Sequence, residues 1–181
     1  MTIVKNIDVK FKDVKFFEIR SFNDERGAFR EVYNKEILDC IGPNVEFVQD
    51  NESHSIFGTL RGLHIQKHPY TQSKLIRASL GKVQDVIVDT RVDSDTYGQW
   101  ESYELSRDNN QILFVPRGFA HGFLALSEKV IVNYKTDNYF NNQSESGLLY
   151  NDPDIGIEWC LNFDQIIISK KDSNLPKLKE L

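Results

Sequence analysis

The chain has 181 residues, of which 40% are hydrophobic and 27% charged, and its formal net charge is -5 at pH 7. This length suits one well-buried core, and we expect a single domain over residues 1–181. The acidic balance argues against a nucleic acid or an anionic membrane surface as a partner, although a few arginines could still hold a small anion. Residues 1–12 contain no apolar run of the length of a signal peptide or membrane span, which predicts a soluble, cytoplasmic protein.

Short strands dominate the expected secondary structure. Strand-like patterns cover residues 7–19, 28–33, 45–51, 59–66, 74–80, 83–89, 100–105, 111–115 and 129–135, with a turn at 23–27. Asn34 can cap one short helix, which Gly42 and Pro43 end. From residue 151 the chain is typical of a surface segment or a closing strand. Many short strands without a sustained helical period predict an antiparallel barrel or sandwich.

Two cysteines, Cys40 and Cys160, lie far apart in the sequence. They have neither the spacing of a zinc site nor that of a redox pair, so we expect buried free thiols.

The stretch Thr59-Leu60-Arg61-Gly62-Leu63-His64-Ile65-Gln66 is the first candidate site. A period of two places Leu60, Gly62, His64 and Gln66 on one face and Arg61, Leu63 and Ile65 on the other. Gly62 indicates a point where the backbone must come close to another group. On this stretch alone, His64 is more often a solvated histidine of an edge strand than a catalytic one.

A second landmark, Pro116-Arg117-Gly118-Phe119-Ala120-His121-Gly122-Phe123, follows an apolar strand. Its P-x-G-x-x-H spacing resembles the second motif of the cupin superfamily, which implies a jelly roll and often a metal held by histidines and a carboxylate. Here Gln66 stands where a second histidine of the first motif is expected, and Lys74 follows where a carboxylate is wanted. An ammonium repels a cation and has no lone pair to offer, so we predict no metal.

A histidine near a lysine and a tyrosine suits acid–base chemistry without a metal. Imidazole titrates at about 6.5 and can remove a proton that an adjacent carbonyl has acidified. A lysine can stabilise the enolate oxygen, and a phenol on another strand can return a proton to the opposite face of the carbon. Such a set would invert a stereocentre.

Several motifs together resemble the dTDP-4-dehydrorhamnose 3,5-epimerase family from about Phe22 to Asp172. Besides the two stretches above, they are Asp24-Glu25-Arg26-Gly27, Phe47-Val48-Gln49-Asp50-Asn51, Ser73-Lys74-Leu75, Val86-Ile87-Val88-Asp89-Thr90-Arg91, Asn151-Asp152-Pro153 and Lys171-Asp172. The resemblance implies an all-β fold, a cupin-type jelly roll built as a double-stranded antiparallel β-barrel with short flanking helices. It also implies a homodimer that exchanges N-terminal strands, and no cofactor.

The resemblance further implies roles for individual residues. His64 is expected as the base, with Asp172 setting its tautomer, and Tyr134 as the acid. Lys74 and His121 are expected near the keto and hydroxyl groups of the sugar. Nucleotide and diphosphate contacts are expected from Arg26, Gln49, Asn51 and Arg61, and further ligand contacts from Glu31, Tyr139, Glu145 and Lys171. Taken singly, each of these residues has an ordinary structural reading, such as a barrel-lining aromatic for Tyr134 or a surface charge for Asp172.

The implied reaction inverts C3 and C5 of dTDP-4-dehydro-6-deoxy-D-glucose to give dTDP-4-dehydro-L-rhamnose. Ala28, the turn at 94–98 without proline, and Tyr150 depart from the usual family pattern, and they leave open which base or sugar is bound. The alternatives are a 3-epimerase for another deoxysugar, a metal-dependent cupin such as a dioxygenase, and a non-catalytic cupin that binds sugar nucleotides.

Overall fold

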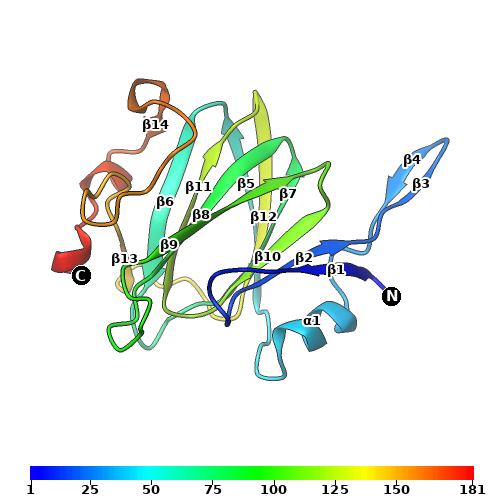
Figure 1. Ribbon diagram of the computed structural model, residues 1–181, viewed down its shortest axis with the longest axis horizontal. Coiled ribbons are helices and arrows are strands. Elements are labelled where there is room, and N and C mark those ends of the chain that lie inside the picture. The colour runs from blue at the N-terminus through cyan, green and yellow to red at the C-terminus, as the bar shows by residue number, and fades with distance from the viewer.

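A computed structural model describes residues 1–181, which form two antiparallel sheets packed face to face (Figure 1). The first sheet runs in the order β1 (Ile3–Ile7), β2 (Lys15–Ile19), β10 (Gln111–Val115), β7 (Lys74–Leu80), β12 (Lys129–Thr136) and β5 (Gln49–Ile56). The second runs β13 (Glu145–Gly147), β6 (Thr59–Gln66), β11 (Phe119–Ala125), β8 (Lys82–Asp89) and β9 (Trp100–Ser106), and β14 (Ile167–Ile168) lies parallel to β6. The expected cupin-type jelly roll is confirmed.

The main core lies between the two sheets, where alternate residues of each strand point inward. Sixteen buried residues form this cluster, among them Ile76 and Ala78 of β7, and Val83 and Ile87 of β8. Val86 and Val88 of β8 instead pack on the outer face of the second sheet. Strand β8 is therefore covered on both faces, as its apolar run Val86-Ile87-Val88 predicts.

Helix α1 (Lys35–Ile41) covers the outer face of the first sheet. Its N-cap is Asn34, whose side-chain oxygen accepts a hydrogen bond from Ile37 N at 3.1 Å, and Gly42 ends it with a φ of 133°. Ile37 and Ile41 are buried against strand residues such as Phe17. The predicted helix is confirmed at both ends, because its start and stop signals are local.

The C-terminal segment covers the outer face of the second sheet. Leu148, Ile155 and Ile157 pack there against Leu63 of β6. The rest of the segment is irregular, with three short 3-10 helices at Phe163–Gln165, Asp172–Asn174 and Leu178–Glu180. This segment carries Asp172 across the molecule to β6, and only 4% of Asp172 is exposed.

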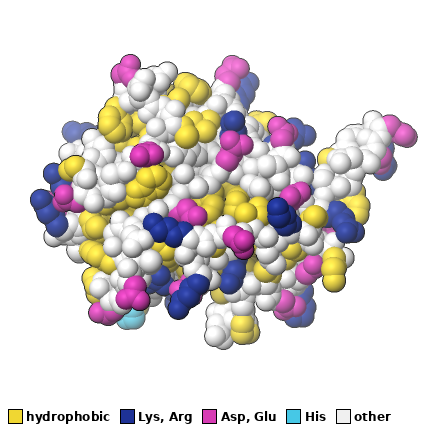
Figure 2. All heavy atoms as spheres, viewed as in Figure 1, with side chains coloured by type: hydrophobic (Ala, Val, Ile, Leu, Met, Phe, Trp, Pro, Cys, Tyr) yellow, Lys and Arg dark blue, Asp and Glu magenta, His cyan; other side chains and the backbone are white.

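A hairpin of β3 (Phe22–Asp24) and β4 (Gly27–Phe29) projects from the body of the molecule (Figure 1). All six of its strand residues are exposed, and Phe29 keeps 66% of its surface accessible. Figure 2 shows the hairpin as an arm with acidic and basic side chains at its tip. A two-stranded hairpin of this kind is marginal by itself in water, so another surface is needed to cover its aromatic residues.

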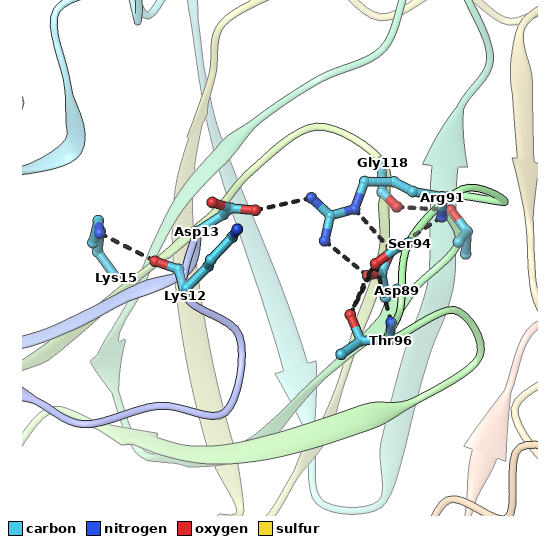
Figure 3. Close-up of polar contacts among 9 residues, drawn as sticks. Lys12, Asp13, Lys15, Asp89, Arg91, Ser94, Thr96 and Gly118 are labelled. Atoms are coloured by element: carbon cyan, nitrogen blue, oxygen red, sulfur yellow. Dashed lines mark hydrogen bonds and ion pairs between the residues drawn. The ribbon is translucent and has the colours of Figure 1, made fainter.

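The loop between β8 and β9 is anchored by Asp89, which is fully buried (Figure 3). Its carboxylate accepts hydrogen bonds from the Arg91 guanidinium at 2.9 and 2.7 Å, and from the hydroxyls of Ser94 and Thr96 at 2.6 Å each. These bonds outweigh burial and hold the pKa of Asp89 well below its ordinary value. Arg91 also pairs with Asp13 at 3.1 Å, which ties the N-terminal segment to this loop.

Several sequence-based boundaries differ from the structure. The strand predicted over residues 7–19 forms only at its end, as β2 (Lys15–Ile19), and β1 ends at Ile7. Residues 8–14 form the turn between these strands, and Phe11 and Val14 are buried there in the core. The extended pairing predicted over 28–33 ends at residue 29, and the strand predicted over 45–51 is β5, which covers Gln49–Ile56.

The prediction of two buried free thiols is only partly confirmed. Cys40 and Cys160 are free thiols, but Cys40 is half-buried and Cys160 exposed, since neither lies on an inward face. No helix combines the length and the apolar character that crossing a membrane requires.

Candidate active site

A cavity of about 490 Å³ lies beside β6 and reaches between the two sheets. The second sheet contributes His64 from β6 and His121 from β11, while the first sheet contributes Lys74 from β7 and Tyr134 from β12. The cavity is also lined by Ser53, Thr59, Leu60, Arg61, Gly122, Phe123, Ile167, Ile168, Ser169, Lys171 and Asp172. Seven of the predicted site residues therefore meet at one place: Arg61, His64, Lys74, His121, Tyr134, Lys171 and Asp172.

A bulge in β6 sets which side chains face this cavity. His64 pairs with His121, whereas Phe123 pairs with Arg61, so two residues of β6 stand opposite one residue of β11. Gly62 has a φ of 127°, and a Cβ on it would lie 2.6 Å from the Cα of Gly122. The close backbone approach predicted from Gly62 is confirmed.

The same bulge corrects the prediction for Arg61. Strict alternation placed Arg61 on the face opposite His64, but both line the cavity because the extra residue shifts the pattern by one. The guanidinium of Arg61 donates to Ser55 Oγ at 3.1 Å and to the carbonyl of His54 at 3.0 Å. These bonds hold its positive charge at the edge of the cavity.

His64 and Asp172 form a hydrogen-bonded pair, with 2.8 Å between Nε2 and Oδ1. The second carboxylate oxygen accepts the backbone N–H of Gly62 at 3.2 Å. Burial favours the neutral acid, but the hydrogen bond from His64, its charge and the Gly62 amide together hold the pKa of Asp172 below its ordinary value. Because a carboxylate only accepts hydrogen bonds, Nε2 carries the proton and Nδ1 is left able to take one up.

A second such pair joins His121 to Asp85 of β8, a residue that the sequence did not single out. Both oxygens of Asp85 lie 3.0 Å from Nε2 of His121, and both side chains are buried. Burial lowers the pKa of His121 although the carboxylate opposes it. The available signal was an acid that shares the inward face of the strand with Val83 and Ile87, two apolar core residues.

Lys74 and Tyr134 complete the polar lining. Burial lowers the pKa of Lys74 to about 8, although the charge of Asp85 raises it. The ammonium donates to the carbonyl of His64 at 3.5 Å. Burial raises the pKa of Tyr134, with Arg61 acting in the opposite direction, so its phenol stays protonated at neutral pH. The cavity therefore offers a carboxylate-held imidazole, an ammonium and a neutral phenol.

Six of the predicted residues do not line the cavity. Gln49 and Asn51 lie on β5 opposite Thr136 and Tyr134, and they bond to each other at 2.8 Å. Glu145 instead pairs with Lys171 at 2.6 Å. Tyr139 is exposed in the loop that follows β12.

Arg26 and Glu31 also lie outside the lining of the cavity. Arg26 is at the hairpin tip, where it pairs with Asp24. Glu31 accepts a hydrogen bond from Thr2 Oγ1 at 2.9 Å and lines a different groove, on the first sheet. Neither residue lines the cavity of its own chain, although Tyr134 lines both the cavity and the groove beside Glu31.

The lining lacks the donor set of a cupin-type metal site. No three His, Cys, Asp or Glu side chains come together in a way that could hold a metal ion. The Nε2 atoms of His64 and His121 each face a carboxylate already, and Lys74 brings an ammonium to the cavity. These residues do not fit a divalent cation.

The family model for dTDP-4-dehydrorhamnose 3,5-epimerase matches residues 8–180. The chain belongs to this family. The dTDP-4-dehydrorhamnose 3,5-epimerase of Methanothermobacter thermautotrophicus is 50% identical over 160 residues, which cover 88% of this chain and 86% of that enzyme. The family resemblance seen in the motifs is thereby confirmed over nearly the whole chain.

Two solved structures of the epimerase fold bear on the ligand. One is a dTDP-6-deoxy-D-glucose-3,5-epimerase from Legionella pneumophila in complex with dTDP-4-keto-L-rhamnose, with a TM-score of 0.92 and 39% identity over 97% of this chain and 93% of that chain. The other is a 3'-monoepimerase from Streptomyces bikiniensis in complex with dTDP-quinovose, with a TM-score of 0.88 and 27% identity over 94% and 86%. The same fold thus serves epimerases that differ in the number of centres they invert.

Proposed function

We propose that this chain is a metal-independent epimerase that inverts C3 and C5 of dTDP-4-dehydro-6-deoxy-D-glucose to give dTDP-4-dehydro-L-rhamnose. One observation carries the proposal: a carboxylate-held imidazole, His64, and a protonated phenol, Tyr134, reach one cavity from opposite sheets. An epimerase needs a base on one side of a carbon and an acid on the other. The family membership supports the substrate class.

The C3 and C5 protons of the substrate both neighbour the C4 ketone, which acidifies them. Nδ1 of His64 takes one proton, and the electrons of the broken C–H bond pass to the C4 oxygen to form an enolate. The phenol of Tyr134 then gives a proton to the opposite face of that carbon, and the ketone re-forms with the centre inverted. Exchange with solvent resets both groups before the second centre reacts.

Lys74 is proposed to stabilise the enolate oxygen. Lys74 is half-buried and lines the cavity inside the barrel, where water screens its charge less than at the surface. A fixed positive charge next to a developing oxyanion acts more strongly in such a site than in water. Asp172 positions the base by holding Nε2–H of His64.

The nucleotide and diphosphate are proposed to lie at the mouth of the cavity. Arg61 and Lys171 bring positive charge there, and Lys171 can exchange its bond with Glu145 for one to a phosphate. Gln49 and Asn51 lie on the adjoining strand β5 and offer amide groups. Tyr139, exposed in its loop, has an aromatic face free for stacking on a base.

We also propose the homodimer expected from the sequence, in which each hairpin of β3 and β4 reaches the cavity of its partner. The proposal is supported by the exposed Phe22 and Phe29, and by the position of Arg26 at the tip of the projecting hairpin, outside the lining of its own cavity. Burying the two aromatics against a second copy would stabilise a hairpin that is marginal by itself. The cytoplasmic location stays a prediction.

A 3-epimerase is the second candidate, favoured by the similarity to the Streptomyces bikiniensis 3'-monoepimerase. The cavity residues allow either outcome, because the number of inverted centres depends on how the sugar ring turns between two proton transfers. Proton NMR of dTDP-4-dehydro-6-deoxy-D-glucose incubated with the protein in deuterated water separates them. Deuterium at both C3 and C5 supports the 3,5-epimerase, label at C3 alone supports the 3-epimerase, and no enzyme-dependent exchange would rule out both.

A further inference from the structure

Asp85 is a charged residue in the main core of the barrel. It lies on β8 between the inward-facing Val83 and Ile87, and its exposed fraction is 0%. A carboxylate in such a place is costly unless its charge is compensated. The inward-facing neighbours of Asp85 on this strand are apolar, and core packing gives no reason for an acid between them, so its partners indicate its role.

The only hydrogen bonds of the Asp85 side chain are to Nε2 of His121, at 3.0 Å from each oxygen. Its charge also acts on the ammonium of Lys74, on the strand β7 of the opposite sheet. Asp85 therefore links two cavity-lining groups without lining the cavity itself. Titratable groups from the neighbouring strands surround Asp85, His121 and Lys74. Besides His121 of β11 and Lys74 of β7, they are His64 of β6, Tyr103 of β9 and Tyr134 of β12.

We propose that Asp85 is a positioning residue for the epimerisation, which holds His121 as the Nε2–H tautomer and keeps the ammonium of Lys74 charged beside the enolate. This inference rests on the proposed function. The two side chains then have different roles: Lys74 donates a hydrogen bond to the C4 oxygen, while Nδ1 of His121 is left as an acceptor for a hydroxyl of the sugar. Asp85 acts only through these two side chains.

The charge on Lys74 makes the proposal testable through pH. Burial brings the pKa of Lys74 down to about 8, and Asp85 is the charge that opposes this fall. Removing the carboxylate charge lowers the pKa of Lys74 further, because the ammonium loses its counter-ion. The amine would then be neutral over part of the range where the wild-type side chain is charged, and the enolate would lose its stabilising charge at a lower pH.

Asp89 provides a matched control on the same strand. It is also fully buried, but its carboxylate is taken up by Arg91, Ser94 and Thr96 at the end of the barrel (Figure 3). Asp89→Asn therefore removes a buried carboxylate of the same strand without touching the link to His121. We expect it to lower the melting temperature and to leave the pH dependence of kcat in place.

The experiment compares the pH profiles of kcat for the wild type, Asp85→Asn and Asp89→Asn with the epimerase substrate. For Asp85→Asn we expect the alkaline limb to move to lower pH by about one unit or more, as loss of an opposite charge typically shifts a pKa. Activity should recover in part as the pH is lowered, and KM should change little. An alkaline limb that coincides with that of the wild type, or that moves equally in Asp89→Asn, would overturn the role of Asp85.

A measurement on the wild type keeps the inference testable if Asp85→Asn does not fold. Nitrogen NMR of histidine-labelled protein reports the tautomer of each ring, and His121→Gln assigns the signal. We expect His121 to carry its proton on Nε2 at neutral pH; a proton on Nδ1 alone would refute the proposal. This readout does not depend on turnover. An inactive wild type would refute the proposed function, and the tautomer of His121 would still test the role of Asp85.

Discussion

His64 of β6 and His121 of β11 stand directly opposite each other in the second sheet, and each imidazole lies against a carboxylate of its own. The side chain of His64 is 32% exposed and that of His121 only 8%. Water in the cavity can therefore reach His64, as the proposed exchange of its proton with solvent requires. Burial keeps the pKa of His121 low, so this ring stays neutral as a hydrogen-bonding group. Two similar pairs thus suit different tasks because their burial differs.

Asp172→Asn should impair the base without removing the imidazole. The amide lacks the negative charge that stabilises protonated His64, and it can turn its NH₂ group toward the ring and select the wrong tautomer. We expect kcat to fall roughly 100- to 10,000-fold, the range for loss of a positioned general base, while KM changes little. Steady-state kinetics measure both constants. A kcat within a factor of a few of the wild type would remove Asp172 from the mechanism.

Tyr134→Phe should separate proton removal from inversion. His64 can still remove and return a proton on its own side of the ring, but no phenol remains to protonate the other face. We expect deuterium from solvent to enter the starting sugar with retention of configuration, and little epimer to form. Proton NMR in deuterated water follows both processes. Continued inversion at the wild-type rate would mean that another group supplies the acid.

Gly62→Ala should destabilise the fold through a backbone clash. A Cβ at this position meets the Cα of Gly122 at 2.6 Å, and neither backbone can move without disturbing the pairing of β6 and β11. Gly27→Ala is the matched control, since Gly27 has nearly the same φ, 126° against 127°, but nothing within 4 Å of its Cβ.

Both glycine variants incur the backbone penalty of a positive φ, about 1–3 kcal/mol. We expect Gly62→Ala to lose roughly 1–3 kcal/mol more in the free energy of unfolding, the usual effect of overpacking. Urea denaturation followed by fluorescence measures the difference. Equal losses for the two variants would show that the close approach of Gly62 and Gly122 is relieved at no cost.

The proposed hairpin exchange predicts complementation between two inactive variants. His64→Ala lacks the base, and Arg26→Ala lacks the charge that the hairpin brings to the partner's cavity. In a mixed dimer, one cavity combines an intact His64 with an intact Arg26 from the other chain. Co-expression should restore about one quarter of the wild-type activity, because half of the dimers are mixed and each has one complete site. No recovery above the two separate variants would reject the exchange.

Local patterns were sufficient for much of the architecture. The strands at Thr59–Gln66, Lys74–Leu80 and Gln111–Val115 begin and end where alternation and breaking residues predict, and Asn34 caps the helix as expected. A period of two and a capping side chain are properties of neighbouring residues, so they can be read without knowing the fold. The motifs are likewise visible in the sequence itself, and their order identified the family.

The tertiary structure decided the relations between strands that are distant in the sequence. The bulge opposite Gly122 turned Arg61 into the cavity, where period-two counting had put it on the other face. Asp85 became a partner of His121 through the pairing of β8 with β11. Register and burial arise only when separate segments pack together, and they determine which carboxylate meets which imidazole. The sequence alone therefore determined the elements and the family, and packing decided the electrostatics of the cavity.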